Sequence, residues 1–439
     1  MPDDSAHNLL FSNDQHGVYP GSWYAASVQQ PPVRPPLVGR REFDVVVIGA
    51  GFTGLSAALK LSEQGYRVAV VEAHRAGWGA SGRNGGQLGS GQRADQDVLE
   101  QRYGVTHARQ LWQLAQESKQ LVARLIATHS IDCDYRSGII HANHRKRYAT
   151  ATRQYVDLLR SAYDYQQITY IEGESLYEKI GSREYLSASV DTGAGHLHPL
   201  KYALGLAAAA CRAGAEIFEM SVVDKIDYGK TVNVSTQQGN IEAASLVFAC
   251  NGYLGGLHRA VASKVMPINN FIIATQPLDE SLNRTILPDN MAVADSRFVV
   301  NYFRKSADSR LLFGGRESYG YRFPVDIKSY VKQAMVQIYP QLESTGIDHG
   351  WGGTLAITMN RMPHIAALAP NVYTASGYSG HGVGMATLSG HLVADAIDGT
   401  LKQFDVMAKI KHAMFPGGSS LRSPLMKLGM FYYSLRDKL

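Results

Sequence analysis

Cysteine is scarce in this chain, and the few copies lie far apart. The 439 residues include only Cys133, Cys211 and Cys250, and none belongs to a CxxC pair. This spacing excludes a disulfide framework and the usual cysteine-based zinc site. We therefore expect a protein of a reducing compartment, the cytoplasm.

Long hydrophobic runs are also missing. No stretch approaches the roughly 18 apolar residues that suggest a membrane-spanning helix. The chain opens with the acidic sequence MPDDS, and no apolar segment of the kind found in signal peptides follows it. The sequence thus predicts neither a membrane span nor a secretory leader.

The body of the chain has no excess of positive charge. The formal net charge is +5, and residues 401–439 account for all of it, so residues 1–400 balance to zero. A balanced body excludes a broad basic surface for nucleic acid. Residues 415–439 mix apolar and basic side chains, but Pro416 and Pro424 interrupt them, so we expect packing on the protein rather than membrane contact.

Glycine, by contrast, is abundant, with 43 residues. The first cluster, Gly49-Ala50-Gly51-Phe52-Thr53-Gly54, follows the apolar run 44–48 and precedes helically spaced leucines and alanines. A second apolar run, 67–72, ends at Glu72. The pattern is a strand, a helix and a strand carrying a dinucleotide-binding GxGxxG motif.

Each part of this motif has a physical purpose. Gly49 permits a tight turn, Gly51 lets a pyrophosphate approach the backbone, and Gly54 lets helix and strand pack closely. Phe52 and Thr53 open the helix, whose N-terminus attracts anions. Glu72, followed by Ala73, can accept hydrogen bonds from ribose hydroxyls, and its charge argues against a 2′-phosphate.

Two further glycine-rich segments distinguish the chain from a minimal NAD-binding fold. Residues 77–89 carry Arg and Asn among glycines, which a flexible linker would not need, and residues 377–386 end in the start of another helix. Both suit a longer cofactor with a large ring. The residues expected to contact it are Gly79, Ala80, Ser81, Arg83, Asn84, Gly85, Gly86 and Gln87 in the first segment, and Gly380, His381, Gly382, Val383 and Gly384 in the second.

Together these motifs resemble the FAD-dependent oxidoreductases of the D-amino-acid oxidase superfamily over roughly residues 40–400. Within it, Trp23-Tyr24, the segment 351–354 and the ending 415–418 look most like the γ-glutamylputrescine oxidoreductase group. The resemblance implies that Val223 holds the adenine through its backbone, that Gly252 ends a strand near the cofactor, and that Gly380 to Gly384 line the isoalloxazine ring.

The expected fold class is α/β (α+β overall), with a Rossmann-like FAD-binding domain and a discontinuous substrate domain built on an antiparallel sheet. Residues 298–304 and 310–316 read as a hairpin of that sheet. The predicted division is an N-terminal arm at 1–40, whose aromatic residues pack on the body; an FAD-binding domain at 41–95, 196–260 and 346–400; a substrate domain at 96–195 and 261–345; and a C-terminal tail at 401–439.

The chain departs from some relatives at functional positions. Sarcosine-oxidase-like members attach flavin to a Cys where this chain has Gly353, so we predict non-covalent FAD. Lysines that those members place near the flavin match Leu312 and Gly384 here. The electron acceptor is therefore open between O2 and another acceptor.

The implied reaction is oxidation of an amine C–N bond to an imine, with γ-glutamylputrescine or a related polyamine derivative as the small-molecule substrate. Alternatives are a glycine, sarcosine or D-amino-acid oxidase or dehydrogenase, and a non-catalytic FAD-binding subunit. Candidate catalytic residues are His381, Tyr302, Arg304, Arg316 and Trp351, which could bind an amine or a carboxylate. His196 and His198 lack a third ligand, so no metal site is predicted.

Overall fold

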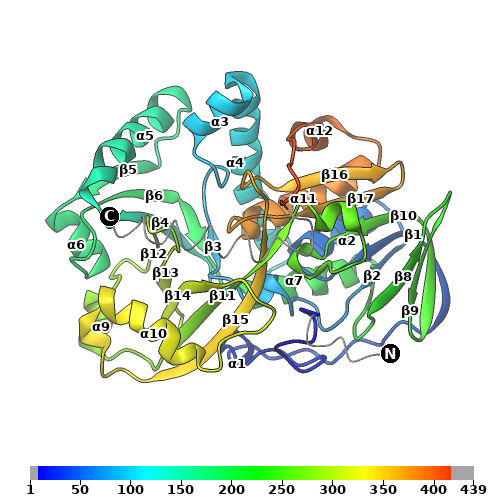
Figure 1. The fold of residues 1–439 in the computed structure, drawn as a ribbon, viewed down its shortest axis with the longest axis horizontal. Coiled ribbons are helices and arrows are strands. Elements are labelled where there is room, and N and C mark those ends of the chain that lie inside the picture. The colour runs from blue at the N-terminus through cyan, green and yellow to red at the C-terminus, as the bar shows by residue number, and fades with distance from the viewer. Residues whose placement is uncertain (1–7, 417–439) are drawn as a thin grey trace.

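The computed structural model describes residues 8–416 and contains two β-sheets with a cavity at their junction (Figure 1). The first sheet is built around β1 (Gly39–Ile48), which runs parallel to β2 (Val68–Val71) on one side and to β10 (Gly239–Phe248) on the other. Further strands extend it on both sides: β7 (Glu216–Phe218), β8 (Val223–Asp227), β9 (Val232–Thr236), β16 (His364–Ala369) and β17 (Val372–Ser376).

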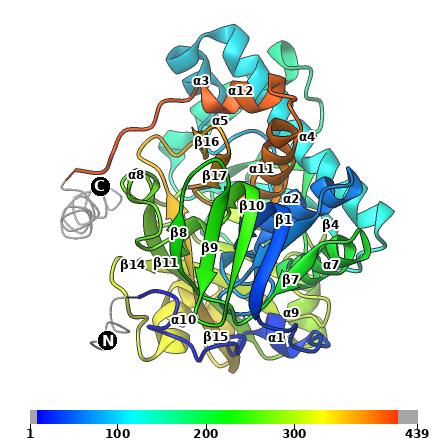
Figure 2. The ribbon, with the colours of Figure 1, turned by 90° about the vertical axis from the view of Figure 1, so that its right-hand side faces the viewer.

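Successive β1 side chains enter different cores because a strand alternates its faces. Val45 and Val47 join a helical layer, whereas Val46 and Ile48 join the core beneath the β8–β9 hairpin. The helical layer contains α2 (Phe52–Glu63), α4 (Val105–Thr128), α7 (Pro199–Arg212) and α11 (Gly382–Ile397). The β1, β9 and β10 side of this unit faces the viewer in Figure 2.

The second sheet is mostly antiparallel, as expected, although β12 and β4 pair in parallel. Its order is β15-β11-β14-β13-β12-β4-β6-β3, with β5 on β6. The bounds of these strands are β3 (Gln87–Leu88), β4 (Arg136–Asn143), β5 (Ile168–Glu172), β6 (Ser187–His196), β11 (Met266–Thr275), β12 (Ala292–Asp295), β13 (Tyr302–Lys305), β14 (Leu311–Ser318) and β15 (Ile347–Ile357). The predicted hairpin is present as β13 and β14.

Shorter helices complete both parts. They are α1 (Trp23–Ala26), α3 (Gln96–Tyr103), α5 (Ala149–Ala162), α6 (Glu174–Ile180), α8 (Arg259–Ala262), α9 (Glu280–Thr285), α10 (Ile327–Ile338) and α12 (Lys402–Ala408). Buried residues of α10, including Val331 and Met335, share a core with Phe271 and Phe313 of the second sheet.

The structure differs from the expected division in three places. Residues 87–88, expected with the FAD-binding unit, form β3 and pair with β6 of the second sheet. Residues 347–357, expected with the FAD-binding unit, form β15 and pair with β11 from Met266 opposite Ile357 to Thr275 opposite Ile347. Residues 96–128, expected with the substrate unit, form α3 and α4. Their buried face, including Leu111 and Leu125, belongs to the core of the FAD-binding unit. Apolar periodicity predicts such a helix but not which sheet its buried face will contact.

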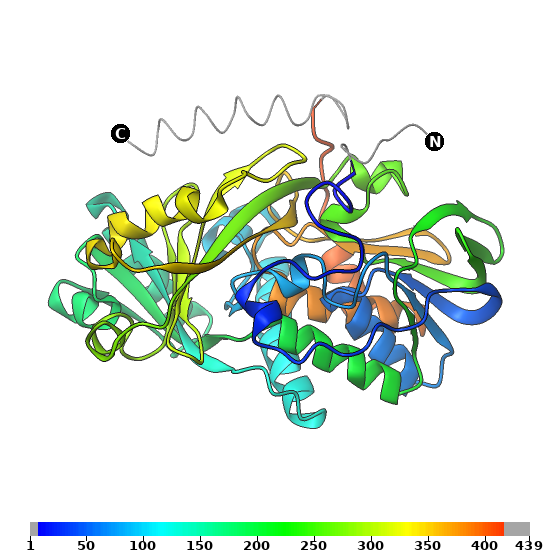
Figure 3. The same ribbon diagram turned by 90° about the horizontal axis from the view of Figure 1, so that it is seen from below.

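The N-terminal arm packs on the body, as its aromatic residues predicted, and crosses the side of the molecule that faces the viewer in Figure 3. Tyr24 is fully buried and contacts Trp351 at a ring-centroid distance of 5.1 Å. Asn13 exchanges hydrogen bonds with the loop around Phe323. Asp14 forms a 2.7 Å ion pair with Arg83. The arm thus fastens both structural parts.

Within residues 8–416, no helix is long and apolar enough to cross a membrane. The beginning of the tail packs on the body, since Phe404 and Met407 of α12 are buried and Phe415 joins a core cluster with Met266. The remainder of the basic tail, residues 417–439, lies outside the described residues.

Loss of the arm's ion pair should destabilise the protein. The Arg83 side chain is 1% exposed, so Asp14→Asn leaves a buried guanidinium without its counter-charge. Breaking such a pair costs about 3 kcal/mol. Chemical unfolding should show this loss, whereas Asp227→Asn, which breaks an exposed pair with Lys225, should cost under about 1 kcal/mol. Equal effects of the two substitutions would contradict the role of the arm.

Candidate active site

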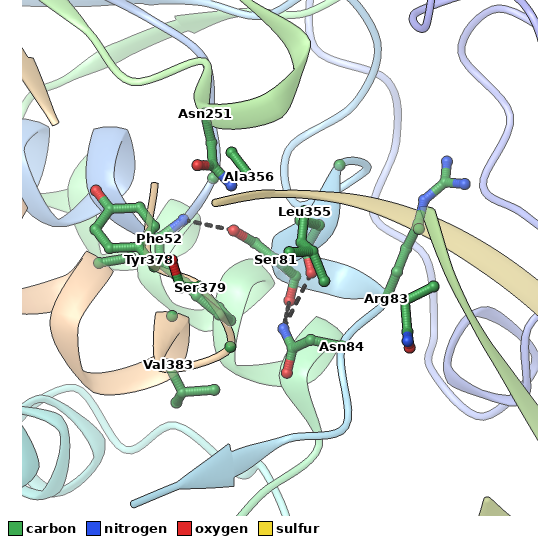
Figure 4. Close-up of a pocket in the computed structure, with 18 of the residues that line it drawn as sticks. Phe52, Ser81, Arg83, Asn84, Asn251, Leu355, Ala356, Tyr378, Ser379 and Val383 are labelled. Atoms are coloured by element: carbon green, nitrogen blue, oxygen red, sulfur yellow. Dashed lines mark hydrogen bonds between the residues drawn. The ribbon is translucent and has the colours of Figure 1, made fainter. Parts of the chain in front are cut away.

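A cavity of about 640 Å³ lies where the carboxyl ends of the parallel strands meet the second sheet. Its size is that of a small-molecule or cofactor site. Residues at or just beyond the ends of β1, β2 and β10 line it, including Ile48, Val71 and Ala249. Figure 4 shows the part of its lining around Ser81 and Tyr378.

The turn between β1 and α2 has the geometry that phosphate groups require. Gly49 adopts φ +106°, and a Cβ there would lie 2.8 Å from the Ala249 carbonyl oxygen. Gly51 lines the cavity, and a Cβ on it would come within 2.8 Å of Ser81 Oγ. The backbone N–H of Phe52 donates to that same oxygen (2.9 Å; Figure 4). Gly49, Gly51 and Phe52 thus line the cavity at the start of α2, where an anion is favoured.

Glu72 stands beside this turn. Its carboxylate accepts hydrogen bonds from the backbone N–H groups of Ala50 (2.7 Å) and His74 (2.9 Å). Burial raises its pKa to about 7, and these two hydrogen bonds oppose the rise. The carboxylate lines the cavity near Val223 and Ala73, as expected for the adenosine end of a dinucleotide.

The second glycine-rich loop is held by its own side chains. Asn84 donates to the carbonyls of Ala80 and Ser81, both at 3.0 Å (Figure 4). Arg83 lines the cavity, but its guanidinium turns away from Ser81 and donates to the carbonyls of Trp78 and Gly352 as well as to Asp14. Its Nη2 atom is buried and has no protein partner.

The third loop joins the two helices that approach the cavity. Tyr378 and Thr53 share a 2.6 Å hydrogen bond, which ties the loop before α11 to the first turn of α2. Gly380, at φ +100°, and His381 follow along the cavity wall. Burial lowers the pKa of His381 to about 3, with smaller contributions from Arg93 and His141. The imidazole is therefore neutral near pH 7.

Most of the expected cofactor residues converge on this cavity. Those that line it are Gly49, Gly51, Phe52, Thr53, Glu72, Ala73, Gly79, Ala80, Ser81, Arg83, Asn84, Gly85, Gln87, Val223, Gly380, His381, Gly382 and Val383. Gly54, Gly86, Gly252 and Gly384 do not line it. A Cβ on any of these four would come within 3 Å of another part of the protein, such as the Gly49 carbonyl at 1.9 Å from Gly54. Their role is close packing.

Only part of the expected substrate set reaches the cavity. His381 and Tyr302 line it, whereas Arg304, Arg316 and Trp351 do not. Arg304 is 4% exposed and donates to the carbonyls of Gly85 and Leu197 and to the Tyr24 hydroxyl. It therefore fastens the second loop rather than facing a substrate.

Arg316 and Trp351, like Arg304, contact other parts of the protein rather than the cavity. Arg316 adopts φ +62° at a bulge of β14, and its guanidinium lies over the Tyr330 ring. Trp351 is 2% exposed and donates from Nε1 to the Arg83 carbonyl (3.0 Å). Strand alternation alone could not reveal which neighbours these two side chains would contact.

Tyr302 is placed by two glycines. A Cβ on Gly314 or Gly85 would lie 2.1 Å or 2.7 Å from its ring, so the ring fits only because both side chains are absent. Its hydroxyl donates to Asn270 Oδ1, and burial raises its pKa above the usual value of 10. Tyr302 therefore offers an aromatic wall and stays protonated.

Sequence reasoning missed several charged or titratable side chains of the cavity, among them Arg93, His141, Glu317 and Arg361. They come from a loop, two strands and a turn, and none belongs to a motif. His141 is exposed because it projects from β4 into the cavity. No signal within one sequence brings such scattered residues together.

Comparison with known proteins identifies the fold and its cofactor. The family model described as FAD dependent oxidoreductase matches residues 44–396. The chain belongs to this family. It is an FAD-dependent oxidoreductase, as the motifs predicted. A relative named probable oxidoreductase OrdL, from Rhizobium meliloti, is 41% identical, covering 97% of this chain and 99% of the relative.

Two further comparisons bear on this flavoprotein. The γ-glutamylputrescine oxidoreductase of Escherichia coli is 39% identical, covering 95% of this chain and 98% of its own. The crystal structure of glycine oxidase from Geobacillus kaustophilus superposes with a TM-score of 0.69 at 21% identity, covering 81% and 95% of the two chains. The latter likeness supports the α/β fold with its two sheets.

The residues of the cavity fit FAD. Gly49 and Gly51 of the turn after β1 line the cavity and can hold a pyrophosphate. Glu72 can accept hydrogen bonds from ribose hydroxyls, and the buried Nη2 of Arg83 is a donor without a protein partner. The loops at Asn84 and Gly380 lie beyond that turn, where a ring would extend. The proposed holding residues are therefore the lining members of the expected set.

FAD release on denaturation tests the non-covalent prediction. Gly353, which matches the flavin-bearing Cys expected of sarcosine-oxidase-like members, lines the cavity. The only cysteine in the described lining is Cys250, whose pKa burial raises to about 12. A thiol with that pKa is a poor nucleophile near neutral pH. Acid precipitation should leave all the flavin in the supernatant, and flavin that stays with the pellet would contradict the prediction.

The neutral state of His381 gives a pH prediction. The folded protein lowers its pKa from 6.5 to about 3, so this group adds stability above pH 6.5 that is lost as the pH falls toward 3. His381→Asn replaces this imidazole with a side chain that cannot titrate. It should not remove an ionisation from the pH profile of kcat/KM between about pH 5 and 9. Loss of such a step in the variant would show that His381 titrates during catalysis.

Proposed function

We infer that this FAD-dependent oxidoreductase oxidises the C–N bond of an amine to an imine, which water then hydrolyses, and that its substrate is γ-glutamylputrescine or a related polyamine derivative. The observation that carries the proposal is a cavity with an aromatic wall at Tyr302, continuous with the loops that fit FAD. The 39% identity to a γ-glutamylputrescine oxidoreductase over nearly the whole chain supports the substrate class.

When bound, FAD supplies a hydride acceptor for the α C–H of the amine. The protein has to orient that carbon and favour the unprotonated nitrogen. Free alkylamines have a pKa of roughly 10, so an enclosed aromatic wall assists by disfavouring the ammonium ion. Tyr302 and the neutral His381 form such a wall and carry no charge near pH 7.

The compound that would finally accept the two electrons of the oxidation is O2 or another acceptor. Leu312 and Gly384 stand at the two positions matched to lysines of sarcosine-oxidase-like members. Leu312 is packed with Trp351 and Ala274, and Gly384 abuts Ser118. Among the described residues that line the cavity, none is a lysine.

Anaerobic reduction of the holoenzyme tests the function. Polyamines, γ-glutamylated amines, glycine, sarcosine and D-amino acids are added one by one while flavin absorbance is followed. We expect the second-order rate constant of flavin reduction to be largest for γ-glutamylputrescine. Bleaching by a free amino acid instead would favour the amino acid oxidase alternative, and an FAD that no compound reduces would favour a non-catalytic subunit.

A further inference from the structure

Two arginine side chains line the cavity without a protein partner. Arg93 follows β3, and Arg361 lies in the turn between β15 and β16. Within residues 8–416, neither guanidinium donates a hydrogen bond or forms an ion pair. The other arginines of the wall are paired, Arg83 with Asp14 and Arg297 with Asp295. Half-buried guanidinium groups without partners are costly, so a bound anion would relieve them.

The two free cations are close to each other and to the loop proposed for the flavin ring. Burial lowers the pKa of Arg93, and the charge of Arg361 lowers it further. Arg93 Nε lies 3.9 Å from the position that a Cβ on Gly380 would occupy. The two charges create a positive potential that disfavours a small dication such as putrescine.

A negative side chain faces the same region. Glu317 of β14 lines the cavity and accepts a 2.5 Å hydrogen bond from the Tyr319 hydroxyl. Burial raises its pKa, whereas Tyr319, Arg361 and Arg93 act in the opposite direction and favour the carboxylate. Two guanidinium groups on loops and one carboxyl group on β14 therefore line the same cavity.

We propose that Arg93 and Arg361 bind the α-carboxylate, and Glu317 the α-ammonium, of an amino-acid group attached to the amine substrate. This assignment rests on the amine oxidation inferred above and specifies its substrate class as a diamine acylated by the side-chain carboxyl of an amino acid. A γ-glutamyl group carries both charges side by side, and an arginine can bind its carboxylate through two parallel hydrogen bonds. Free putrescine has no carboxylate for the two arginines to bind.

A dead-end ligand isolates this recognition from catalysis. γ-Glutamylbutylamide has the amino-acid group but lacks the terminal amine of the putrescine chain, and its binding to oxidised holoenzyme can be followed by the flavin spectrum. Arg93→Gln and Arg361→Gln should each raise its Kd about 10- to 100-fold, as expected for a lost charge-assisted hydrogen bond. Arg322→Gln, the same change at an exposed arginine outside the cavity, should leave the Kd unchanged.

A comparison of two ligands tests the role of Glu317. Glutarylbutylamide lacks the α-ammonium group, so wild-type protein should bind it more weakly than γ-glutamylbutylamide. Glu317→Gln should raise the Kd of the γ-glutamyl ligand about tenfold and reduce the preference between the two ligands. Arg93→Lys and Arg361→Lys keep the charge and should give Kd values between those of wild type and the Gln variants.

Wild-type Kd values in Arg93→Gln and Arg361→Gln proteins that retain FAD and their circular dichroism would overturn the assignment. If γ-glutamylputrescine still bleached the flavin in that case, the proposed amine oxidation would stand while this recognition failed. Conversely, tight arginine-dependent binding of γ-glutamylbutylamide, with no bleaching by any amine, would support the recognition and overturn the oxidation.

Discussion

The close approach of α2 to the turn after β1 is the constraint on which the rest of the structure depends. A Cβ on Gly54 would lie 1.9 Å from the Gly49 carbonyl, and one on Gly390 of α11 would lie 2.4 Å from the Thr53 carbonyl. These glycines allow α2 to lie tightly between the parallel sheet and α11. The starts of both helices then reach one cavity, where the N-terminus of α2 can face a pyrophosphate and the loop before α11 can face a ring.

The arginines around the cavity are of two different kinds. Arg83 and Arg304 are buried and bonded to carbonyl groups, so they connect the arm, the second glycine-rich loop and the strands of the second sheet. Arg93 and Arg361 have no such partners and face the cavity. The first kind supplies rigidity through satisfied hydrogen bonds, and the second supplies charge for recognition.

Several features were predictable because they depend on local sequence. The GxGxxG turn, Glu72 and both later glycine-rich segments converge on the cavity as expected, and the comparisons confirm the FAD-dependent family. The residues that face the substrate were harder to predict from the sequence. Alternation placed Tyr302 and Arg304 on one face of β13, yet hydrogen bonds to the Gly85 and Leu197 carbonyls hold only Arg304 away from the cavity.

By itself, the sequence determined the dinucleotide-binding unit, the cofactor class and the arm's need to pack, because glycine spacing and apolar periodicity act over a few residues. Only the tertiary structure decided that 347–357 joins the second sheet, that α4 packs on the first core, and that Arg93, Glu317 and Arg361 meet. These outcomes depend on strand register and on packing between segments far apart in the chain, which no local pattern encodes.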